Sequence, residues 1–270
     1  MFLKNLIVHL DQGERTAARL NLAVSLAKMH QARLVGVFGQ RAQPQKVGVV
    51  ASWPSQEYVV ARDASKLAFE KATSGLSRAE WHDINRGSDA EVVSHIVTLA
   101  RHADLVVLGQ HDERHKSHVP EELVMEVILE CGRPVLVVPY AGSFAEVGKH
   151  PLIAWNNARE AAHALNDALP LIGGCDEAMV LSFSAHHDEG ESSCAEVARH
   201  LATHGINAKA EVMVVQDFGI MDLLLNRVTD LGADLLVMGA HDHIGFPFVS
   251  RGGGTRHILR HMTVPVLMSN

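Results

Sequence analysis

The chain has 270 residues, of which 47% are hydrophobic and 20% are charged, a balance that excludes a disordered protein. Its net charge of −7 gives no support to a nucleic acid or an anionic membrane surface as partner. The three cysteines lack CxxC spacing, as is typical of reduced, buried thiols. The apolar stretch Leu6 to Val8 is too short for a signal peptide or a membrane helix, which needs about 20 apolar residues, so we expect a cytoplasmic protein.

The sequence contains an internal repeat. Three blocks recur in the same order in both halves: LIVHLDQGERTAARL (6–20) with PLIAWNNAREAAHAL (151–165), ADLVVLGQHD (103–112) with ADLLVMGAHD (233–242), and RPVLVV (133–138) with VPVLMS (264–269). About fifteen extra residues of the first half are most simply placed in the irregular stretch around 40–60. The repeat predicts two similar domains, 1–145 (the first copy) and 146–270 (the second copy).

The first copy alternates short apolar runs with segments of helical periodicity, which is typical of βαβ units and a parallel sheet. Strands are expected at Leu6–Leu10, Leu34–Phe38, Leu105–Leu108 and Val135–Val138. Helices are expected around Leu20, Ala23, Val24 and Ala27, which share one face, and at Ala64–Ala72, Glu91–Arg101 and Glu121–Glu130.

The second copy repeats this alternation after a linker at 139–150 that is rich in turn-forming residues. Its expected strands are Leu152–Trp155, Met179–Phe183, Val212–Val215, Leu235–Met238 and Val264–Met268. Gly173-Gly174, Gly205 and Gly232 fall just past expected helix ends, where a left-handed backbone is favoured.

The segment 239–256, GAHDHIGFPFVSRGGGTR, resembles the Gly-x2-Gly-x9-Gly-Ser/Thr stretch of universal stress proteins. Gly239 and Gly252 match the first and third glycines, whereas Asp242 stands at the second and Gly253 takes the Ser/Thr place. The ending TRHILRHMTVPVL and the segment 86–91 (RGSDAE) are also similar to that family. The resemblance implies an α/β protein with two tandem doubly wound parallel-sheet domains, Rossmann-like and five-stranded with order 3-2-1-4-5. These would form a pseudo-dimer through their last strands and serve stress-response regulation or survival.

A candidate nucleotide site lies in the second copy, where a strand ends at Gly239 and glycines open the last helix. Bare backbone N–H groups at a helix N-terminus suit a phosphate, and the resemblance implies adenosine contacts from Trp155, Asn156 and Phe183. The candidate residues for ATP or another adenine nucleotide are Trp155, Asn156, Phe183, Gly239, Ala240, His241, Asp242, Gly252, Gly253, Gly254 and Thr255. The alternative interpretation is a sterically required turn without a ligand.

Two departures oppose nucleotide binding. A carboxylate at Asp242 about 4 Å from a phosphate oxygen would cost about 1–4 kcal/mol, and Asn156 replaces the acid that the family usually has. In the first copy, Glu121 and Glu122 stand where the second has Gly252 and Gly253, and carboxylates there satisfy the helix dipole and repel phosphate. We therefore expect the first copy to be a degenerate, structural or regulatory site.

The histidine-rich loops offer a competing hypothesis. His111, Asp112, His115 and His118 share one loop, and His241-Asp242-His243 occupy the matching position in the second copy. Imidazole and carboxylate at this spacing can bind zinc, with His111, His115 and His118 as ligands, but no cysteine joins them and a solvated polar loop is the alternative. No metal is expected.

No catalytic residue is predicted, because nothing places a nucleophile beside a general base. The resemblance implies at most slow ATP hydrolysis. The expected partners are an adenine nucleotide, an unidentified protein, and a second chain in a homodimer of tandem chains. A ligand-free interaction scaffold is the alternative function.

Overall fold

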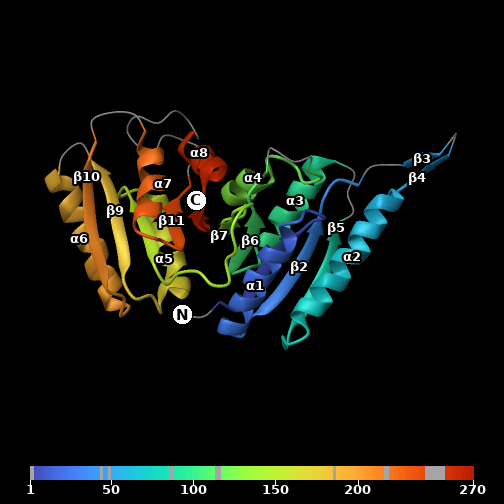
Figure 1. Cartoon of the computed structure of the whole chain (residues 1–270), viewed down its shortest axis with the longest axis horizontal. Helices are drawn as coiled ribbons and strands as arrows, with labels where there is room; N and C mark the ends of the chain where they lie inside the picture. The colour runs from blue at the N-terminus through green and yellow to red at the C-terminus, as the bar shows by residue number, and fades with distance from the viewer. Residues whose placement is uncertain are drawn as a thin grey trace. The chain divides into compact units, whose positions relative to one another are not determined.

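The computed structural model describes residues 3–42, 45–47, 50–84, 88–112, 117–184, 187–215, 219–240 and 253–270. The chain divides into two compact units, Phe2–Arg133 and Pro134–Asn270, each an α/β arrangement of strands and covering helices (Figure 1). None of the described helices is both long and apolar enough to span a membrane. The predicted domain boundary between residues 145 and 146 was drawn from the sequence repeat, and it stays a prediction.

The first copy contains nine elements of the expected alternation besides a hairpin described below. They are β1 (Asn5–Leu10), α1 (Thr16–His30), β2 (Arg33–Gly39), α2 (Gln56–Thr73), β5 (Ala79–Ile84), α3 (Asp89–Ala100), β6 (Leu105–Gly109), α4 (Leu123–Glu130) and β7 (Val135–Val138). Their strand order is β5-β2-β1-β6-β7, which is the predicted order 3-2-1-4-5. Strand β1 pairs in parallel with both β2 and β6.

The second copy has the same plan. Its elements are β8 (Pro151–Trp155), α5 (Arg159–Ile172), β9 (Ala178–Ser184), α6 (His187–Thr203), β10 (Ala208–Val214), α7 (Ile220–Asp230), β11 (Leu235–Gly239), α8 (Gly253–His261) and β12 (Val266–Ser269). The order β10-β9-β8-β11-β12 is again 3-2-1-4-5. Strands β7 and β12 pair antiparallel, with Leu136 opposite Leu267, which confirms the predicted pairing of the last strands.

Strand register confirms the duplication. Leu6 lies opposite Leu105 in the first copy, and Pro151 lies opposite Leu235 in the second. These positions differ by 145 (151 minus 6) and 130 (235 minus 105), the two offsets seen in the sequence. The central strands supply the core, because Val106, Val107, Leu236 and Val237 are all fully buried.

The extra residues of the first copy form a hairpin rather than irregular chain. Strands β3 (Gln45–Val47) and β4 (Val50–Ser52) pair antiparallel between β2 and α2. Strand β5 was also absent from the sequence prediction. Among the described strands it pairs with β2 alone, and of its 6 residues only Ile84 is buried, so it lacks the continuous apolar run of a central strand.

Several predicted boundaries were wrong. Helix α2 begins at Gln56 instead of Ala64, because the hydroxyl of Ser55 accepts a hydrogen bond from the Tyr58 N–H (3.3 Å) and caps the helix. Helix α4 begins at Leu123 instead of Glu121. Gly205 and Gly232 have the expected positive φ, 76° and 59°, whereas Gly173 ends α5 with φ −61°. Of the three cysteines, Cys131 and Cys194 are buried, as predicted, whereas Cys175 is partly exposed.

Candidate functional site

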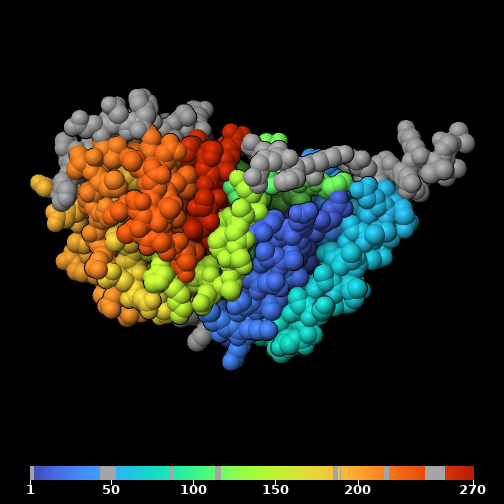
Figure 2. All heavy atoms as spheres, in the orientation of Figure 1, coloured from blue at the N-terminus to red at the C-terminus, as the bar shows by residue number. Residues whose placement is uncertain are grey.

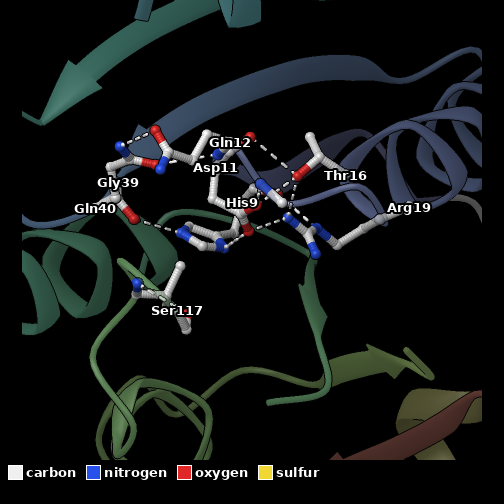
Figure 3. Close-up of polar contacts among 10 residues, drawn as sticks. His9, Asp11, Gln12, Thr16, Arg19, Gly39, Gln40 and Ser117 are labelled. Atoms are coloured by element: carbon white, nitrogen blue, oxygen red, sulfur yellow. Dashed lines mark hydrogen bonds and ion pairs between the residues drawn. The ribbon is translucent and has the colours of Figure 1, made fainter. Parts of the chain in front are cut away.

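A buried arginine lies at the carboxyl ends of β1 and β6 in the first copy. Arg19 extends from α1 and is only 4% exposed. Its Nε donates to the carbonyl oxygen of His9 (2.6 Å) and its Nη2 donates to Oδ2 of Asp11 (2.7 Å), as Figure 3 shows. A methyl group at Gly109 would lie 2.0 Å from Nη1 of Arg19. The guanidinium therefore spans the ends of both strands.

The carboxylate of Asp11 is held on both oxygens. Oδ1 accepts hydrogen bonds from the Thr16 hydroxyl (2.7 Å) and from the Gly13 N–H (2.5 Å), and Oδ2 accepts from Arg19. Burial alone would raise the pKa of Asp11, but the charges of Arg19 and the hydrogen bonds from Thr16 and Arg19 outweigh it and hold that pKa well below its usual range. Asp11 and Arg19 are therefore an ionised pair at neutral pH, in which Arg19 is buried and Asp11 is partly buried.

His9 completes this cluster as a neutral side chain. Its Nε2 lies 2.7 Å from the carbonyl oxygen of Gly39, and since a carbonyl can only accept, Nε2 carries the proton. Its Nδ1 lies 3.8 Å from Oδ2 of Asp11. Burial, and then the charge of Arg19, lowers the pKa of His9 to about 4. We call His9, Asp11, Thr16 and Arg19 the first-copy ion cluster.

The position of this cluster matters for ligand binding. In doubly wound sheets, ligands bind outside the carboxyl ends of the strands at the point where strand order reverses. In the first copy that point lies between β1 and β6. It is the place that the side chain of Arg19 fills, with its counter-ion Asp11 beside it. The molecule's own charges therefore occupy the position where a ligand would be expected.

The second copy has no such charges at the equivalent positions. At the 145 offset, the first-copy ion cluster corresponds to Ala154, Asn156, Ala161 and Ala164. A methyl group at Gly239 would lie 2.6 Å from the backbone nitrogen of Ala161 and 2.7 Å from the carbonyl carbon of Glu160. The first turn of α5 thus packs directly against the end of β11, where the first copy has an arginine side chain.

Comparison with known proteins rests on structure, since no family model and no curated protein matches the chain. A universal stress protein from Archaeoglobus fulgidus DSM 4304 superposes with a TM-score of 0.69 at 14% identity, over 98% of each chain. The chain has the universal stress protein fold. A Pseudomonas aeruginosa UCBPP-PA14 protein, provisionally named a universal stress protein, has a TM-score of 0.58 at 16% identity, over 99% of this chain and 93% of its own.

A third structure with the same fold is a protein of unknown function from Pseudomonas aeruginosa PAO1. It has a TM-score of 0.60 at 15% identity and covers 99% of this chain and 92% of its own length. All three matches therefore extend over both copies. The resemblance inferred from the glycine-rich segment is confirmed at the level of the fold.

Within this universal stress protein fold, the two predicted aromatic contacts are nearly buried. Trp155 at the end of β8 is 8% exposed, and its Nε1 donates to the Ser193 hydroxyl of α6 (2.7 Å). Phe183 near the end of β9 is 9% exposed. Asn156 follows β8, and its side-chain oxygen accepts from the Ala158 N–H (3.2 Å), which orders the turn into α5. These three residues follow or end adjacent strands, as predicted.

The predicted glycine-rich part is only partly described. Gly253 and Gly254 open α8 with partial exposure, and Thr255 behind them is buried. Ala240 is buried, and its N–H donates to the Ser269 carbonyl (2.8 Å), so that residue extends the pairing of β11 with β12. His241, Asp242 and Gly252 lie outside the described residues.

The alternative metal site gains no support. His111 and His118 are partly exposed, Nε2 of His118 lies 3.8 Å from Oε1 of Glu57, and His115 lies outside the described residues. Across the described part of the chain, no three His, Cys, Asp or Glu side chains are grouped as metal ligands. Glu121 and Glu122 are exposed immediately before α4.

Sequence reasoning missed the first-copy ion cluster. Its signal was present in the repeat, because three polar or charged residues of one copy stand against alanines of the other.

Proposed function

We propose that the chain is a cytoplasmic regulatory protein of the universal stress protein type, acting in stress response or survival, and that its second copy binds an adenine nucleotide. One observation carries the choice of copy. Arg19, paired with Asp11, fills the position between β1 and β6 in the first copy. The equivalent residues of the second copy are the small, uncharged Ala164 and the amide Asn156.

An anionic ligand would meet opposite conditions in the two copies. In the first, a phosphate would have to displace a guanidinium that already donates to Asp11 and to the backbone of His9. Such a displacement would leave the largely buried carboxylate of Asp11 without its cation, which costs several kcal/mol. In the second copy no buried ion pair has to be broken at the equivalent positions.

The described part of the second copy also offers groups that suit a nucleotide. Gly253 and Gly254 form the first turn of α8, where backbone N–H groups have no partner within the helix. Trp155 and Phe183 place aromatic rings, each with only a small exposed part, at the ends of β8 and β9. These two strands lie on the other side of the strand-order reversal from β11 and β12. Phosphate at α8 and a base near the aromatic pair is the arrangement that we propose.

Isothermal titration with ATP, ADP and AMP tests this proposal. Because a carboxylate at position 242 opposes phosphate, Asp242→Gly should tighten ATP binding about tenfold, the equivalent of about 1.4 kcal/mol. Asp112→Gly is the matched control, because Asp112 is the repeat equivalent of Asp242 in the first copy and its replacement should leave affinity unchanged. If Asp112→Gly instead tightens ATP binding, the nucleotide binds in the first copy and the proposed choice of the second copy is wrong.

A ligand-free interaction scaffold is the second candidate, and one observation favours it. Gly239 is required by the close approach of the α5 backbone, so the presence of this glycine needs no phosphate to explain it. If neither the wild type nor Asp242→Gly binds any of the three nucleotides, the scaffold replaces nucleotide binding as the best-supported function.

A further inference from the structure

One face of helix α2 is buried against the rest of the unit Phe2–Arg133. Tyr58 and Phe69 are each 2% exposed. The Tyr58 hydroxyl donates to Oδ1 of Asp83 (2.5 Å), and its ring packs edge-on against Phe38 with centroids 5.5 Å apart. A methyl group at Gly36 would lie 2.6 Å from the ring of Phe69, so that ring rests directly on β2. These contacts fix which side of α2 faces solvent.

The opposite face of α2 is also apolar, although it is exposed. Val60 is 59% exposed and Leu67 is 68% exposed, and both belong to the small set of large hydrophobic side chains that lie open to solvent in the described part of the chain. Ala64, which lies between Val60 and Leu67 on the helix, and Ala68, which follows Leu67, are also exposed. Exposed apolar residues are unremarkable singly, but a contiguous group marks an interaction surface. Figure 2 shows α2 (cyan) at the surface of its unit.

The spacing of this face is that of a helix-pairing seam. Positions 57, 60, 64, 67 and 71 follow one another at alternating intervals of three and four residues, the pattern that places side chains on one side of a helix for packing against another helix. We call Glu57, Val60, Ala64, Leu67, Ala68 and Lys71 the α2 outer stripe. Its centre is apolar, and its two ends carry opposite charges.

The charges select one partner and one orientation. If two copies of the stripe cross antiparallel about a two-fold axis at Ala64, residues equally distant from position 64 face each other. Glu57 of one chain then meets Lys71 of the other, and Val60 meets Ala68. Parallel pairing would instead bring like charges together at both ends, which is unfavourable. Glu57 is 72% exposed although its Oε1 lies 3.8 Å from Nε2 of His118, and Lys71 is exposed, so both side chains are accessible to a second chain.

We propose that the α2 outer stripe binds the same stripe of a second chain, antiparallel and about a two-fold axis, forming a homodimer of tandem chains. Self-complementarity is what a two-fold interface requires, because the same surface must serve both partners. The alanines at 64 and 68 permit close approach of the helices, and Val60 and Leu67 supply the apolar area to be buried. This association is independent of the proposed nucleotide site.

Sedimentation velocity of the full chain, from about 1 μM to about 500 μM, tests the proposal. The wild type should show a concentration-dependent monomer–dimer equilibrium, and Leu67→Asp should weaken it at least tenfold, because the dimer loses two buried leucines and gains two buried carboxylates. Val214→Asp is the control, since Val214 is similarly exposed at 52% and lies on β10, outside the stripe. A wild type that stays monomeric, or a dimer that Leu67→Asp leaves unchanged, would overturn the proposal.

A charge exchange tests the orientation. Glu57→Lys alone and Lys71→Glu alone should each weaken self-association about threefold to tenfold, because each turns two attractive contacts of the dimer into repulsive ones. A mixture of the two single variants should form a heterodimer, since every facing pair is again opposite in charge. Single variants that associate as the wild type does would contradict antiparallel pairing.

Cross-linking gives a measurement that does not depend on affinity. Ala64→Cys should form a disulfide-linked dimer under mild oxidation, because the two-fold axis brings both copies of position 64 together. Ser74→Cys, exposed at the end of the same helix but away from the axis, should not. The wild type, in which Cys131 and Cys194 are buried and Cys175 is partly exposed, is the blank that measures cross-linking through the native thiols. Equal cross-linking of both variants would indicate random collision and refute a specific contact.

Discussion

Mild acid should destabilise the first unit through His9. The pKa of His9 is lowered to about 4 because the ring is buried and Arg19 lies close by, whereas an imidazole in the unfolded chain titrates near 6.5. Between these values the unfolded chain binds a proton that the folded chain does not. Stability is therefore full above pH 6.5 and is lost as the pH falls toward 4. At about 1.36 kcal/mol per pH unit, the loss is about 3 kcal/mol.

Urea denaturation of the full chain between pH 7 and about pH 4 measures this effect. His9→Gln is the reference variant, because an amide can still donate to the Gly39 carbonyl but does not titrate in this range. The advantage of the wild type over His9→Gln should shrink by about 3 kcal/mol across the range. The comparison with His9→Gln is needed because burial also lowers the pKa of His30. A lowered histidine pKa destabilises the folded chain as the pH falls, so His30 contributes to the loss in both proteins. Two stability profiles that stay parallel would refute the reasoning.

The remaining predictions concern charge, packing and metal. Arg19→Met should cost about 3–5 kcal/mol in urea denaturation, because the largely buried Asp11 loses its cation, and adding Asp11→Asn should recover part of that loss. Gly239→Ala should cost about 1–3 kcal/mol, because its methyl group would meet the α5 backbone, whereas Gly174→Ala has open space and should be nearly neutral. Elemental analysis of untagged protein should find well under one transition metal per chain. Stoichiometric zinc that disappears when the histidines of the loop after β6 are replaced would contradict this.

The buried parts of the fold could be predicted from the sequence, and the exposed parts could not. Strands such as β6 and β11 are continuous apolar runs, because both faces of a parallel sheet are covered, and all of their central residues are buried. Strand β5 carries Glu80, His82 and Asp83 at an edge. Its pairing with β2 is specified by its neighbour rather than by its own composition, so no local pattern revealed it.

The candidate site was predictable only in its backbone features. Gly239 and the glycines that open α8 were identified as positions where a side chain would interfere, and for Gly239 the interfering group proved to be a neighbouring helix. The first-copy ion cluster was missed because Asp11 and Arg19 stand eight residues apart and meet only when α1 folds back over β1. Comparison of the repeats residue by residue, rather than loop by loop, would have shown that alanines of the second copy stand at the positions of His9, Thr16 and Arg19.

The antiparallel pairing of β7 with β12 has a consequence for how the chain can be divided. Strand β12 would otherwise present Val266, Leu267 and Met268 along an unpaired edge, and such edges invite association with other chains. A fragment cut at the end of the sequence repeat, 146–270, would lose this cover, whereas a fragment cut at the start of the compact unit, 134–270, would keep it. The last strand of the first copy thus protects the edge of the second, so a fragment boundary has to follow the compact unit rather than the sequence repeat.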